Sequence, residues 1–148
     1  LVWVRAPKDQ YDLPDYAGIM DQYEKLHKDM QDGKVVSAYA LDRHGIAAAV
    51  AKMAFGNGMG VKIEHNLDPR DFFAPGFGDI ILEVPDGKVG ELSITYTVIG
   101  EVTADGNFSY GNARTKLQNL VYLFLYSLEQ TASMTAHVHS SVQVQRWM

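Results

Sequence analysis

The segment from Ser37 to Gly60 constrains the fold of this chain more than any other. Its first part, SAYALD, has the apolar character of a β-strand, and the following HGIAAAVAKMAF has the small and apolar residues of a short helix. Gly56, Asn57 and Gly58 then end the helix. A strand that turns directly into a helix presents backbone N–H groups, and these attract anions such as phosphate. The turn is therefore a candidate anion site.

The segments around this turn alternate between strand and helix patterns. Apolar spacings of three and four predict a helix from Asp15 to Gln31, with Asp15 as its N-cap and Asp29 on its solvated face. Val35–Leu41 is mostly apolar, which predicts a buried strand. The other predicted elements are strands at Leu1–Arg5, Met59–Glu64 and Asp79–Val84, an irregular loop at Asn66–Gly78, a hairpin at Glu91–Tyr110, and helices at Gly45–Phe55 and Lys116–Gln130.

This order of elements predicts an α+β fold, in which helices pack against a mixed β-sheet. We expect one domain over residues 1–130, followed by a tail over residues 131–148, whose weak periodicity and mixed polarity leave open whether it is ordered. The chain opens on a strand-like run without an initiator methionine, so we also expect it to be a piece of a longer polypeptide.

Composition narrows the class of protein. At 148 residues, with 47% hydrophobic and 21% charged residues, the chain has the size and composition of one soluble globular domain. Its formal net charge of -5 argues against a nucleic acid or an anionic membrane as partner. Without cysteine it has no disulfide and no thiolate site. Its longest apolar-rich run, Leu120–Leu128, is much shorter than the roughly 20 residues that span a bilayer.

Three segments carry a resemblance to a known family. They are GKVVSAYALDRHGIAAAVAKMAFGNGMGVKIE at Gly33–Glu64, GDIILEVP at Gly78–Pro85, and YTVIGEVTADGNFSY at Tyr96–Tyr110. In order and spacing they resemble the C-terminal domain of the aminoimidazole ribonucleotide synthetase-related (AIR synthase-related) superfamily. Within that superfamily, the chain resembles the phosphoribosylformylglycinamidine synthase family.

The resemblance implies an activity for the parent enzyme. Members of this family are cytoplasmic ligases of purine biosynthesis, which use ATP and glutamine to convert formylglycinamide ribonucleotide into its amidine. The resemblance implies ATP and Mg²⁺ in the parent enzyme, a ribonucleotide substrate, and ATP-binding and glutaminase domains as partners. Because those domains are separate from this one, we expect the isolated chain to be catalytically inactive. We expect it to hold no cofactor of its own, and we assign it no catalytic or metal-ligating residue.

The chain departs from the family pattern at the turn. Ala40 stands where the family has an acidic residue, Tyr39 where histidine is frequent, and His44 in place of the first glycine of a pair of which Gly45 remains. These departures imply the degenerate half of a duplicated parent. They leave open a second function, a non-catalytic structural or interaction module that retains the superfamily fold. A selenophosphate or thiamine-monophosphate kinase-type protein is a third alternative, which the glycine-rich exit of the helix disfavours.

The candidate substrate- or nucleotide-binding residues are Tyr39, Asp42, Arg43, His44 and Gly45. Arg43 and His44 are able to neutralise a phosphate at the helix N-terminus, and Asp42 to accept a hydrogen bond from a ribose or to coordinate Mg²⁺. The alternative is that Asp42 is a helix N-cap and its neighbours are solvated turn residues. Tyr39 either lines the cleft or packs beneath the helix.

Two further patterns are weaker candidates. The glycines after the helix suit a C-cap better than a phosphate cradle, because a helix C-terminus presents carbonyl groups. His137 and His139 form an H-x-H pair of the kind found in zinc sites, but no third ligand lies near them in the sequence.

Overall fold

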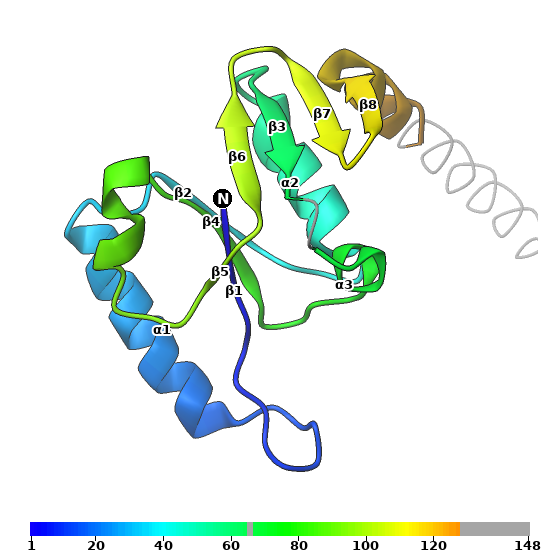
Figure 1. Ribbon diagram of the computed structural model, residues 1–148. Helices are drawn as coiled ribbons and strands as arrows, with labels where there is room; N and C mark the ends of the chain where they lie inside the picture. Colours follow the sequence, from blue (N-terminus) through cyan, green and yellow to red (C-terminus); the bar gives the residue numbers. More distant parts are fainter. Residues whose placement is uncertain (65–66, 128–148) are drawn as a thin grey trace, which may run out of the picture.

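The computed structural model describes residues 1–64 and 67–127, in which strands alternate with helices (Figure 1). The elements in chain order are β1 (Val2–Val4), α1 (Tyr16–Gln31), β2 (Ser37–Ala40), α2 (Gly45–Phe55), β3 (Gly60–Ile63), α3 (Pro69–Phe73), β4 (Ile80–Glu83), the 3-10 helix η1 (Asp86–Glu91), β5 (Thr97–Val98), β6 (Gly100–Thr103), β7 (Asn107–Tyr110) and β8 (Ala113–Lys116). Residues 117–127 are helical. The end of the predicted third helix and the predicted tail lie outside the described residues.

The strands form two four-stranded sheets. The first has the order β2-β4-β1-β5, and its pairs are all antiparallel. The second has the order β6-β3-β7-β8 and is mixed, because β3 pairs in parallel with β7 and antiparallel with β6. The predicted α+β class, with a mixed sheet and packed helices, is therefore confirmed. The division of the strands into two sheets is a finding of the structure.

The predicted hairpin at Glu91–Tyr110 is wrong. Its strands β5 and β6 belong to different sheets, and β3 lies between β6 and β7. Gly100 stands where the chain passes from the first sheet to the second, and a Cβ there would collide with the carbonyl oxygen of Lys62 on β3. Glycine is thus required at this position because two backbones approach each other closely.

The first sheet is covered on both faces, which explains why β1 is completely buried. Val2 and Val4 pack in a cluster with Leu26 of α1, whereas Trp3 belongs to the cluster built on α2. Successive strand residues point to opposite faces, so all of β1 is removed from water, with 6% exposure or less. Residues of α2 also contact β3, so this helix connects the two sheets.

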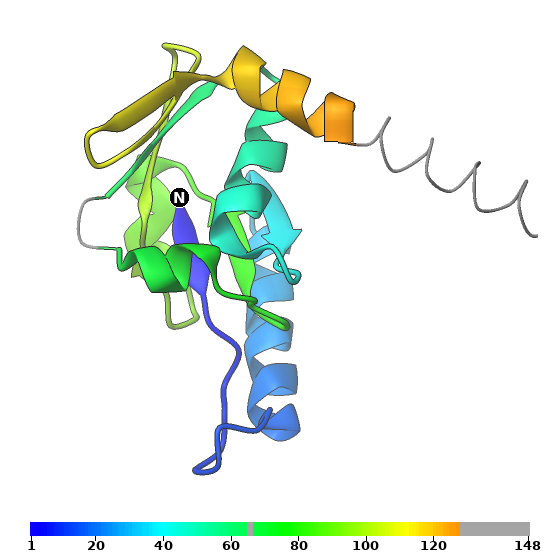
Figure 2. The ribbon, with the colours of Figure 1, turned by 90° about the vertical axis from the view of Figure 1, so that its right-hand side faces the viewer.

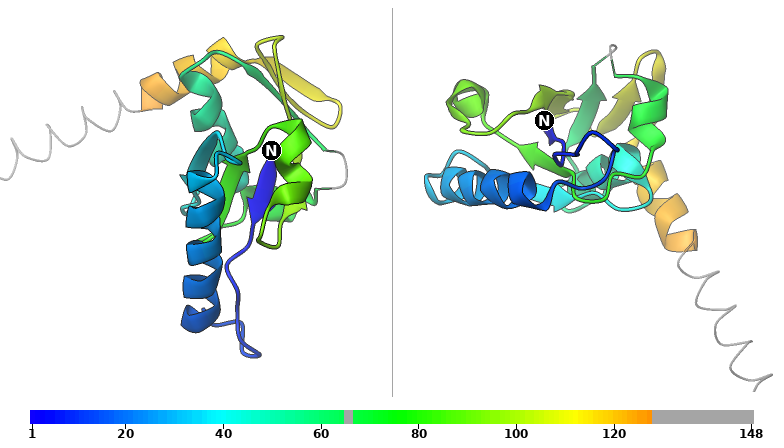
Figure 3. Two further views of the ribbon diagram at one scale, coloured as in Figure 1. Left: turned by 90° about the vertical axis from the view of Figure 1, so that its left-hand side faces the viewer. Right: turned by 90° about the horizontal axis from the view of Figure 1, so that it is seen from below.

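Helix α1 begins and ends where the sequence predicts. The Asp15 side chain accepts a hydrogen bond from the N–H of Gly18 at 3.2 Å, as an N-cap does. Gly33 adopts a left-handed conformation (φ +69°) just after the helix, where a C-terminal glycine is expected. The first turns of α1 and the loop before it extend beyond the sheets (Figures 1 and 3).

The predicted solvent-facing position of Asp29 is wrong. Its side chain is 0% exposed and accepts hydrogen bonds from Lys34 Nζ at 2.7 Å, from the N–H of Ser93 at 2.7 Å and from the Ser93 hydroxyl at 2.9 Å. Loss of water raises the pKa of Asp29, but these three donors outweigh that effect, and the pKa lies below its usual range. The ionised carboxylate therefore ties the end of α1 to the segment that follows η1.

The predicted burial of the second strand is also wrong, because β2 is an edge strand with Ala38 and Ala40 exposed. Three elements were not predicted: α3, η1 and β8. Asp68 caps α3 by accepting a hydrogen bond from the N–H of Arg70 at 2.7 Å, so the predicted irregular loop contains one helical turn. β8 ends at Lys116, the residue at which the sequence predicts a helix to begin.

Candidate functional site

The predicted crossing from strand to helix is confirmed at the end of the first sheet. β2 ends at Ala40, and α2 begins at Gly45. Between them Leu41 is buried, and its N–H donates to the carbonyl oxygen of Asp79 at 2.8 Å. The turn is therefore anchored to the sheet on one side and continuous with the helix on the other.

Asp42 holds this turn together. Its Oδ1 accepts a hydrogen bond from the backbone N–H of His44 at 2.7 Å and lies 3.0 Å from His44 Nδ1. The bond from the His44 backbone is the main reason why the pKa of Asp42 is lowered, and the Lys52 ammonium, 3.6 Å away, adds to it. The alternative prediction that Asp42 is the N-cap of α2 is wrong, because His44 occupies that position and its side chain makes no capping bond.

The other predicted residues lie close to Asp42. Arg43 and His44 are exposed, and Arg43 Nε lies 3.3 Å from His44 Nε2. Tyr39 is half-buried, and Lys52 Nζ lies 5.6 Å from the centroid of its ring. The nearby Tyr39 side chain is the main reason why the pKa of Lys52 is raised, and Asp42 adds to the effect. Tyr39, Asp42, His44 and Lys52 thus form one polar cluster.

Lys52 is the member of the polar cluster that the sequence analysis missed. A signal for it existed in the sequence. Side chains on a helix lean toward its N-terminus, so a long side chain two turns after Gly45 is able to reach back to the turn.

Gly45 is required by the packing of two helices. Its φ is +70°, and a Cβ on it would lie 2.5 Å from the carbonyl oxygen of Ala74 and 3.0 Å from the carbonyl carbon of Phe73. The start of α2 therefore lies directly against the end of α3, where only glycine fits. This structural requirement accounts for Gly45 whether or not a ligand binds nearby.

The glycine-rich exit of α2 forms a helix C-terminal turn, the interpretation that the sequence favoured. Gly58 has φ +67° and donates its N–H to the carbonyl oxygen of Ala54 at 3.1 Å. Asn57 Oδ1 accepts a hydrogen bond from the N–H of Met59 at 3.0 Å. These bonds pair the carbonyl oxygen of Ala54 in the last turn and the N–H of Met59 just after the helix.

The remaining candidate, the pair His137 and His139, lies outside the described residues. Within residues 1–64 and 67–127, no group of three or more His, Asp or Glu side chains is placed to hold a metal ion. The same residues contain no helix long and apolar enough to cross a membrane.

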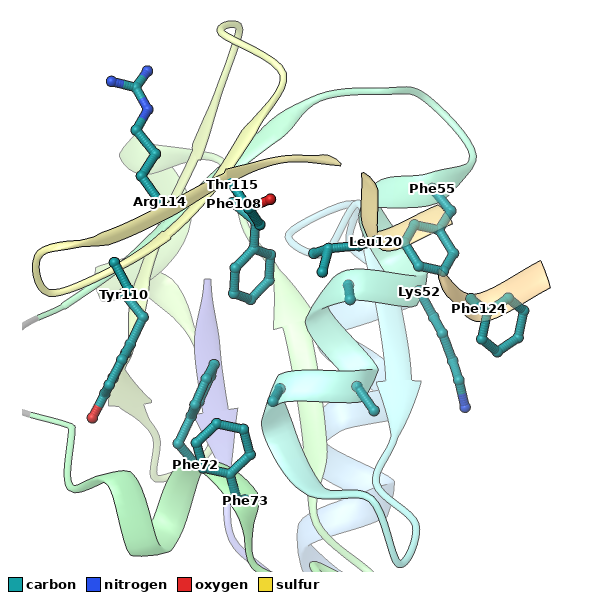
Figure 4. Close-up of a pocket in the computed structure, with 14 residues that line it drawn as sticks. Lys52, Phe55, Phe72, Phe73, Phe108, Tyr110, Arg114, Thr115, Leu120 and Phe124 are labelled. Carbon is teal, nitrogen blue, oxygen red and sulfur yellow. The ribbon is translucent and has the colours of Figure 1, made fainter. Parts of the chain in front are cut away.

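An apolar groove of about 490 Å³ lies between α2, α3, β7, β8 and the helix of residues 117–127 (Figure 4). Helix α2 lines one side with Ala47, Ala48, Ala51 and Phe55. Large apolar side chains line the others: Phe72, Phe73, Phe108, Tyr110, Leu120 and Phe124. The rings of Phe72 and Tyr110 stack with their centroids 4.7 Å apart. Lys52 belongs both to this groove and to the polar cluster.

No family model matches the sequence, but it is similar to those of several curated proteins, among them the following two. Over 96 residues it is 29% identical to the phosphoribosylformylglycinamidine synthase subunit PurL of Lactobacillus acidophilus, a match that covers 62% of this chain and 13% of that protein. Over 97 residues it is 30% identical to the probable membrane antigen 3 of Saimiriine herpesvirus 2, covering 60% of this chain and 8% of that protein. The chain thus spans a small part of the length of these relatives.

The fold is similar to solved structures from Thermotoga maritima. The crystal structure of phosphoribosylformylglycinamidine synthase II superposes with a TM-score of 0.62 at 14% identity, covering 79% of this chain and 24% of that one. The PurL structure complexed with FGAR gives 0.63 at 13% identity, covering 80% of this chain and 27% of that one. These matches show that the chain has an α+β fold of the kind found in phosphoribosylformylglycinamidine synthase II. Within that fold class, the domain is PurL-like.

Proposed function

We propose that this chain is a domain of a phosphoribosylformylglycinamidine synthase, the cytoplasmic ligase that converts formylglycinamide ribonucleotide into its amidine with ATP and glutamine. The observation that carries this proposal is that a curated sequence and solved structures of phosphoribosylformylglycinamidine synthases are both similar to this chain. The Thermotoga maritima PurL structures include complexes with FGAR, ADP and ATP, which supports a ribonucleotide substrate and ATP as cofactor. A further structure of that organism contains PurLQS, which supports an enzyme assembled from several parts.

In this proposal the turn between β2 and α2 faces the phosphate-bearing ligand. Arg43 supplies exposed donors to a phosphate. Asp42 fixes the position of His44 through its two contacts, and His44 Nε2 in turn accepts a hydrogen bond from Arg43 Nε. Helix α2 begins at Gly45, directly after the turn, so the dipole at the N-terminus of this helix adds to the attraction of the phosphate. Tyr39, which belongs to β2, forms one side of the site.

The turn does not fit a Mg²⁺ ion by itself. Mg²⁺ at phosphate sites takes one or two carboxylates, and the two oxygens of Asp42 already face His44 and Lys52. We therefore assign Mg²⁺ and ATP to the ATP-binding domain of the parent enzyme and release of ammonia to its glutaminase domain. On this assignment, the isolated domain is inactive.

The formylglycinamide ribonucleotide itself tests the role of the turn. We expect an excess of about a hundredfold over Kd to stabilise the chain by about 2.7 kcal/mol, which raises Tm by about 5 to 10 °C for a domain of this size. We expect Arg43→Ala to weaken binding by about tenfold or more, because it removes a charge-assisted hydrogen bond. Thermal unfolding monitored by circular dichroism measures both effects.

Arg70→Ala is the matched control, since Arg70 is an exposed arginine of α3. It should bind as the wild type does. An equal loss of binding in both arginine variants would show that overall charge, rather than the turn, attracts the ribonucleotide. The absence of any rise in Tm for the wild type would contradict binding at the turn.

The second candidate function is a non-catalytic structural or interaction module. It is favoured by Ala40, which replaces the acidic residue of the family motif, and by the herpesvirus relative, whose name describes an antigen. Under this alternative, neither the ribonucleotide nor MgADP changes Tm.

A further inference from the structure

The helix of residues 117–127 exposes apolar side chains on every side. Leu117 is buried, but the five consecutive residues Tyr122, Leu123, Phe124, Leu125 and Tyr126 are 36% to 69% exposed. The helix carries no charged residue, and it projects away from both sheets (orange in Figure 2). A helix that is apolar all round is normally covered by other protein, and an exposed apolar patch marks an interaction surface.

The projecting helix also forms one wall of the apolar groove. Leu120 and Phe124 line the groove, and the ring of Phe124 lies 5.6 Å from that of Phe55 on α2. The small side chains of α2 leave room beside this wall for another helix to approach closely. An exposed apolar helix and an open apolar groove therefore lie next to each other on one chain.

We propose that a second copy of this chain covers both surfaces. In a symmetric dimer, the helix of residues 117–127 of each copy lies over the apolar groove of the other. A twofold axis brings the same patch of both copies together, so a single interface fills both grooves and covers both helices.

The charges around the groove permit this contact. Lys52 and Arg114 are the charged residues of its lining, and each faces a carboxylate: Lys52 lies 3.6 Å from Asp42 and Arg114 2.6 Å from Asp105. In Figure 4 the ends of both side chains lie away from Phe72 and Phe108. Although the chain has a net charge of -5, two copies can approach here without like-charge repulsion.

The available surface is close to what a stable dimer needs. Phe73, which is 62% exposed beside the groove, adds to the five residues of the helix. At roughly 100 Å² for each of these half-exposed large side chains, they bury on the order of 600 Å² per copy, against about 800 Å² in a standard interface. The alanines of the groove contribute further area.

Sedimentation velocity of the full chain tests the proposal. We expect a dimer that dissociates on dilution within about 1 to 100 μM, because interfaces of this size begin at micromolar affinity. Leu123→Asp should weaken the dimer about tenfold or more, since it buries an unpaired charge. Ala51→Gln should also weaken it by filling the groove, and its good helix propensity preserves α2. Circular dichroism confirms that each variant is folded.

Met20→Asp is the matched control, because Met20 on α1 is 60% exposed, as Leu123 is. It should leave the dimer intact. A wild-type chain that stays monomeric at every concentration overturns the proposal. So does a dimer that survives both Leu123→Asp and Ala51→Gln, or one that Met20→Asp weakens equally. These results do not depend on ribonucleotide binding, so the dimer and the proposed function can fail separately.

Discussion

Replacing Asp29 by alanine is expected to lower the free energy of unfolding by about 3 kcal/mol or more. Asp29 is fully buried and accepts three hydrogen bonds, one from Lys34 and two from Ser93. Removing one partner of a buried ion pair costs about 3 to 5 kcal/mol, because the other partner remains buried without compensation. Lys34 is only 17% exposed and would lose its main partner. Urea denaturation measures the change.

Asp21→Ala is the control for this prediction. Asp21 lies on the same helix and pairs with Lys25 at 2.6 Å, but the side chains are 64% and 51% exposed. Exposed pairs of this kind contribute about 0.5 kcal/mol or less. Equal losses in the two variants would mean that Asp29 does not act through its buried partners.

The same carboxylate gives stability a defined dependence on pH. The folded-state pKa of Asp29 is lowered from 3.8, so the unfolded chain takes up a proton first as pH falls. The stabilisation is complete above the unfolded-state pKa and is lost as pH falls toward the folded-state value. Asp29→Asn cannot ionise, so the difference in stability between it and the wild type should shrink below about pH 4. A constant difference would argue against an ionised Asp29.

Asp29 also shows where prediction from this sequence stops. The ends of α1 were predictable because Asp15 and Gly33 act on backbone groups a few residues away. The burial of Asp29 was not, because Ser93 lies 64 residues from it in the sequence. In a helical pattern, an aspartate on the charged face is predicted to be exposed to solvent. Only its contacts with residues distant in the sequence show that Asp29 is buried.

The topology of the second sheet escapes prediction for the same physical reason. The runs at β6 and β7 are recognisable as strands, but the short turn between them suggests direct pairing. In the structure β3 lies between them, and no local sequence pattern indicates this arrangement. Gly100 carries a partial signal, since a glycine within a strand pattern marks a bend or a close approach of backbones.

At the candidate site, the turn is predictable from local residue patterns, whereas its contacts are not. The strand-to-helix crossing and the bounds of α2 follow from residues that are neighbours in the chain. The link from Asp42 to Lys52 depends on how a side chain two turns into the helix folds back. The apolar groove depends on elements that are distant in the sequence, so no motif indicates it.

Gly45→Ala is the second variant with a large expected effect, a loss of about 3 kcal/mol in unfolding free energy. A left-handed backbone costs a non-glycine residue about 1 kcal/mol or more, and forcing a methyl group into packed structure adds about 1 to 3 kcal/mol. The methyl carbon would lie 2.5 Å from the carbonyl oxygen of Ala74, so α3 must move away from α2. Urea denaturation again measures the loss.

Two glycines just after α2 distinguish the cost of a left-handed backbone from the cost of the steric clash with Ala74. Gly58 has φ +67°, but a Cβ there would meet no neighbouring group within 4 Å, so Gly58→Ala should lose only the backbone cost of about 1 kcal/mol. Gly56 has φ -69° and equally open space, so Gly56→Ala should be neutral or stabilise by about 0.5 kcal/mol. The order Gly45, Gly58, Gly56 follows only if α3 packs directly on the start of α2. Equal losses at Gly45 and Gly58 would mean that the two helices are not in contact there, and that the turn is held by the sheet alone.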